Sequence, residues 1–199
     1  MDTNHSPIEI LGIAGSLRSG SLNKAALRAA QQLAPPAAVI EIFDIADLPL
    51  YNDDLWAGGT PPARVLELKR AVRAADAILL VTPEYNYSFS GVLKNAIDWA
   101  SRPYGDNAWK GKPVAIMGAS GSPLGTGRAQ YHLRQCFVFL EMYALNQPEV
   151  LINHANQKFD AKGNLTDEPT RERIRQMLAA LIDLTHRVAA PGGAPAVTS

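Results

Sequence analysis

The stretch Gly15-Ser16-Leu17-Arg18-Ser19-Gly20-Ser21-Leu22-Asn23 decides how the rest of the chain is interpreted. An apolar run, Ile8 to Ala14, leads into it, and a helical pattern, Leu22 to Leu33, leads out. A polar, glycine-rich loop before a helix suits an anion, because the first helical turn exposes unpaired N–H groups and a partial positive charge. Serine hydroxyls and the fork of Arg18 can bond phosphate oxygens. Taken alone, the loop is compatible with a phosphate site and also with a plain serine-capped turn.

Apolar runs and helical periods alternate along the rest of the chain, which predicts βαβ units and a parallel sheet. Strands are expected at Ile8–Ala14, Ala38–Ile45, Asp76–Thr82, Lys112–Ala119 and Glu149–Ile152, and helices at Leu22–Leu33, Arg64–Ala75, Gly91–Ala100, Arg128–Tyr143 and Thr170–Val188. The expected fold is α/β, a flavodoxin-like doubly wound sheet of five parallel strands in the order 2-1-3-4-5, with helices on both faces. One domain over residues 8–189 is expected, with a flexible N-terminus at 1–7 and a disordered tail at 190–199.

The loops after strands one, three and four are neighbours in this strand order, and ligands bind at that edge of such sheets. In the loop Pro83–Ser88, Tyr85 and Tyr87 offer flat faces, and backbone N–H groups could meet the edge of a planar heterocycle. The alternative for this loop is a tyrosine-bearing turn packed on a neighbouring helix or subunit. The loop Ser120–Gly127 is rich in glycine and permits close approach to a ring, or is simply the entry to the next helix. Phosphate at one loop and a flat ring between the others describe a mononucleotide, and FMN fits best.

Composition and charge exclude several other classes of protein. The 199-residue chain has 19 Lys plus Arg and 19 Asp plus Glu, so its zero net charge gives no argument for nucleic acid or an anionic membrane. No apolar run approaches the roughly 18 residues that a membrane span needs, and no secretory signal is seen. The single cysteine, Cys136, is expected to be a core thiol, and a cytoplasmic location is expected. The scattered histidines have no metal-ligand spacing, so no metal site is expected.

Three segments together resemble a known family of flavoenzymes. They are the stretch Gly15–Asn23, the segment Pro83–Ser88 with Leu93–Trp99, and the segment Gly118–Gly121 continuing through Arg128–Arg134. They resemble the NADPH-dependent FMN reductase family, and the third segment is similar to its chromate/quinone reductase branch. The resemblance covers about residues 8 to 185.

The resemblance implies a bound FMN and an enzyme that passes hydride from NADPH or NADH, through FMN, to quinones or similar acceptors by a ping-pong relay. Chromate, azo and nitro compounds are further acceptors that it implies. The residues implied to bind FMN are Ser16, Arg18, Ser21, Leu22 and Asn23 around the phosphate and ribityl chain, Pro83, Glu84, Tyr85 and Asn86 along the isoalloxazine, and Ser120 and Gly121 near its pyrimidine end. No catalytic acid or base is expected, and the loop Ala46–Pro62 with the exposed tyrosines is expected to wall the substrate pocket.

The resemblance also implies a homodimer or homotetramer. The helix Gly91–Ala100 would lie near a subunit boundary, and the interface candidates are Tyr85, Tyr87, Arg128, Tyr131 and Glu149. A flavodoxin-type electron carrier, or a flavin-binding sensor or partner module without turnover, is the alternative. The zero net charge argues mildly against a carrier that docks by electrostatics. The choice between NADH and NADPH and the natural acceptor stay open at this point.

Overall fold

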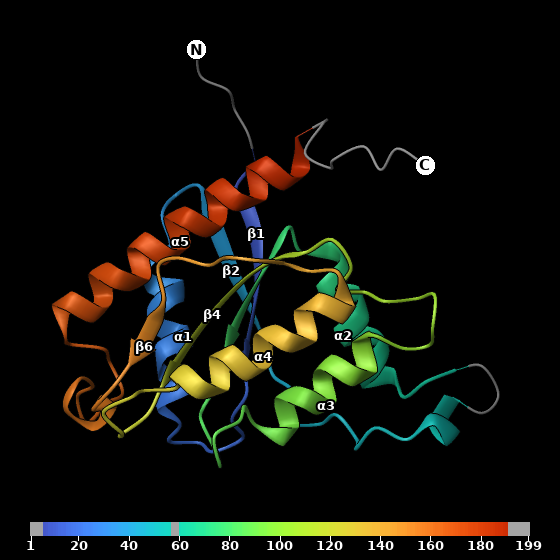
Figure 1. Ribbon diagram of the computed structural model, residues 1–199, viewed down its shortest axis with the longest axis horizontal. Helices are drawn as coiled ribbons and strands as arrows, with labels where there is room; N and C mark the ends of the chain where they lie inside the picture. The colour runs from blue at the N-terminus through green and yellow to red at the C-terminus, as the bar shows by residue number, and fades with distance from the viewer. Residues whose placement is uncertain (1–5, 57–59, 191–199) are drawn as a thin grey trace.

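A parallel sheet lies at the centre of the protein, whose computed structural model describes residues 6–56 and 60–190 (Figure 1). The strands run in the order β2-β1-β3-β4, and two short segments, β5 and β6, both pair with β4. The bounds are β1 Ile8–Ala14, β2 Ala38–Phe43, β3 Ala77–Val81, β4 Pro113–Ala119, β5 Tyr143–Ala144 and β6 Val150–Ile152. The predicted order 2-1-3-4-5 is confirmed, with the last position shared by two segments along β4.

The middle strands are apolar because helices cover both of their faces. All residues of β3 are buried, and their side chains alternate between two separate cores. Leu79 and Val81 face one core, whereas Ile78 and Leu80 face the other. This double burial explains why the strand has a continuous apolar sequence instead of an alternating one.

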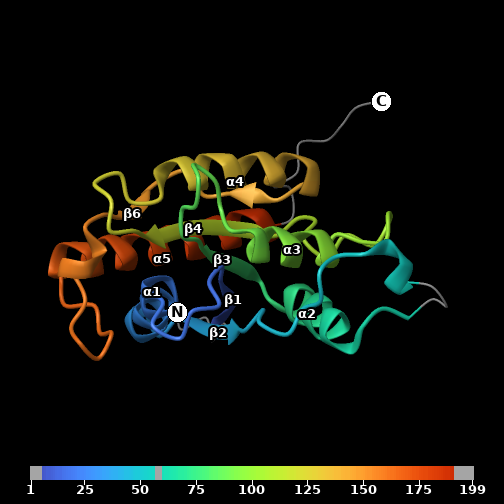
Figure 2. The same ribbon diagram turned by 90° about the horizontal axis from the view of Figure 1, so that it is seen from below.

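The helices form one layer on each side of the sheet (Figure 2). The bounds are α1 Leu22–Leu33, α2 Ala63–Ala74, α3 Gly91–Ala100, α4 Gly127–Leu140 and α5 Glu168–Ala189. Helices α1 and α5 supply apolar residues to one core, and α2, α3 and α4 supply the other. The predicted arrangement with helices on both faces is therefore confirmed.

The C-terminal end of α4 differs from the prediction, which extended this helix to Tyr143. The helix ends at Leu140, because Glu141 adopts a left-handed backbone with φ 56° and the N–H of Met142 bonds to the carbonyl of Phe137. Tyr143 then pairs with Pro113 as the first residue of β5. No glycine marks this helix end, so the sequence contained no local signal for it.

Several other boundaries move by one or two residues. Strand β2 ends at Phe43, where the carboxylate of Asp44 accepts a hydrogen bond from the N–H of Ala46 and turns the chain. Helix α5 begins at Glu168, because Asp167 caps it by accepting from the N–H of Thr170 at 3.0 Å. Two short 3-10 helices, η1 Asp53–Trp56 and η2 Ala155–Gln157, were not predicted.

The expected flexible ends fall largely on residues 1–5 and 191–199, which lie outside the described residues. Within the described part of the chain, no helix is both long enough and apolar enough to cross a membrane.

Candidate functional site

The loop Gly15–Asn23 connects the carboxyl end of β1 to the start of α1. The N–H of Gly15 bonds to the carbonyl of Val81, which keeps the loop beside the end of β3. A Cβ atom at Gly15 would lie 2.8 Å from the hydroxyl oxygen of Ser90, so this close approach requires glycine. Ser21 caps α1, because its hydroxyl accepts hydrogen bonds from the N–H groups of Asn23 and Lys24. The loop thus presents a capped helix N-terminus at the sheet edge.

Asn23 joins this loop to the end of β4. Its side-chain nitrogen donates to the carbonyl of Ala119 at 3.0 Å, and its side-chain oxygen accepts from the N–H of the same residue at 2.8 Å. The side chain is buried, so both bonds are shielded from water. Asn23 therefore positions two walls of the site, and one of its two amide hydrogens remains for a ligand.

The loop after β3 forms a tight turn. Tyr85 and Ser88 exchange two backbone hydrogen bonds of 2.9 and 3.0 Å. Between them, Asn86 and Tyr87 both have a left-handed backbone, with φ 49° and 68°. Two consecutive non-glycine residues in this region indicate strain that the surroundings must hold in place.

Glu84 precedes the turn, and its side chain is almost fully buried, with 5% exposed. Its carboxylate forms an ion pair with Arg128 and accepts a hydrogen bond from the N–H of Ala129 in the first turn of α4 at 3.1 Å. The guanidinium carbon of Arg128 also lies 3.8 Å from the ring centre of Tyr87. Arg128 thus connects the carboxylate, the strained turn and α4.

The loop after β4 is held by the neighbouring segment that follows β6. The N–H of Ser120 bonds to the carbonyl of Ile152 at 2.9 Å, and the N–H of Ala155 bonds to the carbonyl of Ser120 at 3.0 Å. A Cβ atom at Gly118 would overlap the carbonyl oxygen of Thr82 and the hydroxyl of Thr126, so the backbones meet here without room for a side chain. The loop is therefore fixed against both neighbouring strands.

These three loops enclose a cavity of about 400 Å³ at the carboxyl ends of β1, β3 and β4. All the predicted site residues except Asn86 line it: Ser16, Arg18, Ser21, Leu22, Asn23, Pro83, Glu84, Tyr85, Ser120 and Gly121. Asn86 lies next to Tyr85 in the turn and does not line the cavity. The convergence of the loops, which was inferred from strand order, is present in the structure.

The lining contains three residues that the prediction did not include: Gly20, Ala119 and Asn156. Asn156 belongs to η2, far from the loops that carried the sequence argument. It reaches the cavity because the segment after β6 lies against Ser120, and its amide nitrogen would be 3.2 Å from a Cβ atom at Gly121. No sequence motif marked this residue, so only the pairing of β6 with β4 could have revealed it.

The long loop 46–62 was expected to wall the pocket, but none of its described residues lines the cavity. It is tied instead to α3, because the side-chain nitrogens of Asn95 and Trp99 both donate to the carbonyl of Pro49 at 2.8 Å. The N–H of Tyr51 bonds to the side-chain oxygen of Asn95 at 2.7 Å. The described part of this loop therefore does not line the cavity, and its expected place at the substrate stays a prediction. Residues 57–59 lie outside the described part.

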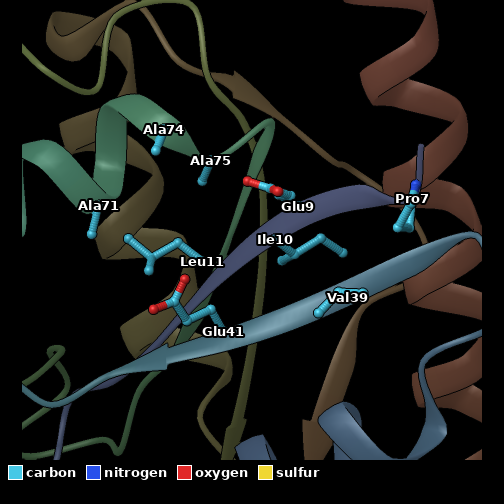
Figure 3. A pocket seen from close by; sticks show the side chains of 9 residues that line it. All are labelled: Pro7, Glu9, Ile10, Leu11, Val39, Glu41, Ala71, Ala74 and Ala75. Carbon is cyan, nitrogen blue, oxygen red and sulfur yellow. The ribbon is translucent and has the colours of Figure 1, made fainter. Parts of the chain in front are cut away.

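A smaller cavity of about 190 Å³ lies beside β1, β2 and the end of α2 (Figure 3). Two of the side chains that line it, Glu9 and Glu41, carry carboxylates, and Figure 3 shows the carboxylate of Glu9 toward Ala75, which follows α2. Glu9 and Ile10 come from the amino-terminal half of β1, away from the three loops. Two carboxylates would repel a phosphate, so this cavity does not suit an anionic ligand.

The chemistry of the larger cavity fits FMN. One end offers the N-terminus of α1, serine hydroxyls and Arg18, whose side chain makes no hydrogen bond or ion pair to a described residue. The other end offers the chain from Pro83 to Tyr85 and the backbone of Ser120 and Gly121. An anion-binding end and a ring-binding end within one cavity are what a flavin mononucleotide requires.

Comparison with known proteins agrees with this geometry. The sequence profile of NADPH-dependent FMN reductases matches residues 8–157, which span all three loops. The chain belongs to the NADPH-dependent FMN reductase family. The predicted family, an oxidoreductase that uses FMN with NAD(P)H, is thereby confirmed. All residues that line the cavity lie within the part of this reductase that matches the family.

Individual relatives extend over nearly the whole reductase. It is 58% identical over 174 residues to the NAD(P)H-dependent FMN reductase PA1204 of Pseudomonas aeruginosa, covering 87% of this chain and 93% of that protein. It is 47% identical over 186 residues to an NADPH:quinone oxidoreductase of Arabidopsis thaliana, covering 91% and 93% of the two chains. Among solved structures, the flavoenzyme NAD(P)H:(acceptor) oxidoreductase FerB of Paracoccus denitrificans superimposes with a TM-score of 0.83 at 39% identity, covering 90% of this chain and 98% of that one.

Three of the five predicted interface candidates, Arg128, Tyr131 and Glu149, interact with residues of the same chain. Arg128 bonds Glu84, and the carboxylate of Glu149 raises the pKa of Tyr131 through a hydrogen bond. Tyr85 and Tyr87 remain largely exposed, at 51% and 69%.

The thiol of Cys136 is half-buried on α4, and burial raises its pKa. A raised thiol pKa disfavours the thiolate, so the side chain is not activated as a nucleophile.

Proposed function

We propose that this reductase transfers two electrons from NAD(P)H to a quinone-like acceptor. The observation that carries the proposal is the single cavity in which a capped helix N-terminus, Arg18 and the Pro83–Tyr85 segment converge. FMN, when bound, supplies the ring that accepts and donates hydride. The names of the relatives support the acceptor class, because they include NADPH:quinone oxidoreductases and a 2-hydroxy-1,4-benzoquinone reductase of a Burkholderia species at 43% identity.

The residues of the chain bind and orient the cofactor. Arg18 and the N-terminus of α1 hold the phosphate, because both are positively charged and both line the same end of the cavity. The segment from Pro83 to Tyr85, which lines the cavity, would contact the ring. The N–H of Ser120 bonds to the carbonyl of Ile152, so the backbone N–H of Gly121 would be the donor at the pyrimidine end, where negative charge is stabilised as in an oxyanion hole.

NAD(P)H and the acceptor bind in turn at one place in this proposal, which gives ping-pong kinetics. The loops after β1, β3 and β4 would surround the cofactor, and Tyr85, which lines the cavity, is 51% exposed. A planar quinone can stack at that side once the oxidised nicotinamide has left. Chromate, azo and nitro compounds are further acceptors to compare in the same assay.

The test is a visible absorption spectrum of the purified protein before and after adding FMN, followed by NADPH without oxygen and then 1,4-benzoquinone. We expect bound flavin bands that bleach with NADPH and return with the quinone, and parallel lines in a double-reciprocal plot when both substrates are varied. Protein that binds no FMN would contradict the site. FMN that stays oxidised with both NADPH and NADH would instead indicate a carrier or sensor.

We also propose that the reductase self-associates through the outer surface of α3 and α4. Large apolar side chains are exposed on α4, with Tyr131 at 61%, Val138 at 82% and Phe139 at 69%, and the ring of Tyr87 lies against Arg128 in the first turn of this helix. A patch of this kind favours burial against a second copy. Sedimentation should give a dimer or tetramer, and replacing Val138 and Phe139 by serine should yield a monomer. A wild-type monomer at micromolar concentration would refute the proposal.

The cytoplasm is the proposed location, supported by the absence of any internal disulfide in a chain with one cysteine.

A further inference from the structure

Glu84 places a carboxylate against the proposed flavin site. Its side chain is 5% exposed and lines the cavity that holds the ring in our proposal. A buried carboxylate is unfavourable unless it is paired, and both of its known partners come from the start of α4. Arg128 forms the ion pair and the N–H of Ala129 donates the hydrogen bond. The charge at Glu84 is thus balanced by residues that do not line the cavity.

Arg128 has a second contact, with the aromatic ring of Tyr87 at 3.8 Å. Tyr87 is the second of two consecutive residues with a left-handed backbone in the Tyr85–Ser88 turn. A side chain that contacts both Glu84 and Tyr87 braces the turn from outside. Arginine suits this position because its planar guanidinium can pair with a carboxylate and stack on a ring at once, which lysine cannot do.

We propose that Arg128 is a positioning residue that neutralises Glu84 beside the isoalloxazine and thereby makes reduction of bound FMN easier. This inference rests on the proposed function, because it assumes that the ring of FMN lies beside Glu84. It assigns to Arg128 a role within its own subunit, distinct from the role at an interface that was expected from the sequence.

The physical reason is the charge that a flavin ring gains when it accepts two electrons. A carboxylate without a partner would repel that charge, and the repulsion would be weakly screened in a buried site. Arg128 and the N-terminus of α4 supply compensating positive charge. Removing Arg128 should therefore weaken the binding of reduced FMN more than the binding of oxidised FMN.

The experiment measures the midpoint potential of bound FMN and the dissociation constant of oxidised FMN in four proteins: the wild type, Arg128→Met, Glu84→Gln and the double variant. Methionine keeps the length of the arginine stem without its charge. We expect Arg128→Met to change the ratio of the two affinities by about tenfold, which lowers the potential by about 30 mV for a two-electron couple. Glu84→Gln should shift the potential upward, and the double variant should lie near the wild type.

Arg134→Met is the matched control on the same helix, because Arg134 bonds to the carbonyl of Leu145 and to Asn146, away from the cavity. Its potential should equal that of the wild type. An unchanged potential in both Arg128→Met and Glu84→Gln would overturn the inference, as would a drop in Arg128→Met that the second substitution does not reverse. If Arg128→Met fails to fold, Glu84→Gln alone decides the question.

The outcomes separate this inference from the proposed function. Wild-type protein that binds no FMN, or binds it without reduction by NAD(P)H, would defeat the proposed function. If the wild-type protein binds FMN and is reduced, but the midpoint potential of bound FMN is the same in Arg128→Met, only the role of Arg128 is refuted. A coupling between Arg128 and Glu84 in the unfolding free energies of the four cofactor-free proteins would show the pair independently of catalysis.

Discussion

The side chain of Asn23 forms two hydrogen bonds with the main chain of Ala119, donating to its carbonyl at 3.0 Å and accepting from its N–H at 2.8 Å. The two residues are 96 positions apart in the sequence. The first turn of α1 is thereby locked to the last residue of β4, so the proposed phosphate end and the proposed ring end of the cavity are held at a fixed separation.

Replacing Asn23 with alanine should therefore impair both stability and cofactor binding. The substitution leaves the buried N–H and carbonyl of Ala119 without partners, which should lower the unfolding free energy by about 1–3 kcal/mol. Urea denaturation of the cofactor-free protein measures this loss, and fluorescence titration measures the affinity for FMN. Gln31→Ala is the control, because Gln31 on the same helix bonds to the carbonyl of Ile40 away from the cavity. That variant should lose stability while its FMN affinity stays unchanged.

Arg18 should contribute to FMN affinity through the phosphate. Its side chain lines the cavity without a partner among the described residues, and a hydrogen bond between charged groups contributes about 1.5–3 kcal/mol. Arg18→Met should weaken FMN binding by about tenfold to a hundredfold, and the loss should shrink for riboflavin, which lacks the phosphate. Arg28→Met, on the exposed side of α1, should bind FMN as the wild type does. Equal losses for FMN and riboflavin would place the phosphate elsewhere.

The elements that sequence analysis located correctly are those whose signals are local. Strand β1 and helices α1 and α3 have the predicted bounds. A continuous apolar run marks the strand, and the N-cap residues Ser21 and Ser90 mark where the two helices begin. The end of α4 was missed because Glu141 takes a left-handed conformation that is usually marked by glycine. A boundary was predicted correctly where a residue type that favours it, such as an N-cap serine, lies within a few positions of it.

The candidate site was predictable to the same extent. Motif-bearing loops identified the residues that come from β1, β3 and β4, since each motif lies next to its own strand. Asn156 and the Glu84–Arg128 ion pair were not identified, because they depend on tertiary contacts: β6 must pair with β4, and α4 must pack beside the turn. Residues that are 44 positions apart, as Glu84 and Arg128 are, leave no pattern in one sequence.

Gly118 should tolerate no side chain. A Cβ atom at this residue of β4 would overlap the carbonyl oxygen of Thr82 and the hydroxyl of Thr126, and the backbone of the buried strand cannot move away easily. Gly118→Ala should lower the unfolding free energy by about 3 kcal/mol or prevent folding. Gly20→Ala is the matched control, because no heavy atom lies within 4 Å of a Cβ atom there. Similar stability of the two variants would contradict the close packing at the end of β4.

The ion pair between Lys69 and Asp106 should make part of the stability depend on pH. Lys69 is buried on α2 with 2% of its side chain exposed, and its ammonium lies 2.7 Å from the carboxylate of Asp106. Hydrogen bonding from Lys69 lowers the pKa of Asp106 below its usual 3.8. Burial lowers the pKa of Lys69 itself, but that effect acts on the alkaline side and leaves the acid range to Asp106.

A carboxyl group whose pKa is lower in the folded state stabilises the protein above its unfolded pKa, and this contribution is lost as the pH falls through the folded pKa. Asp106→Asn should therefore lower the unfolding free energy by about 1 kcal/mol at pH 7, because Asp106 is half exposed. The difference from the wild type should shrink as the pH falls below about 4, near the unfolded pKa. Urea denaturation of both proteins across this range measures it. Glu141→Gln is the control, because it breaks the exposed pair with Lys110. It should lower the unfolding free energy at pH 7 by less than half as much as Asp106→Asn does.

If the difference in unfolding free energy between Asp106→Asn and the wild type persists unchanged into acid, the stabilisation by Asp106 does not come from its carboxylate charge.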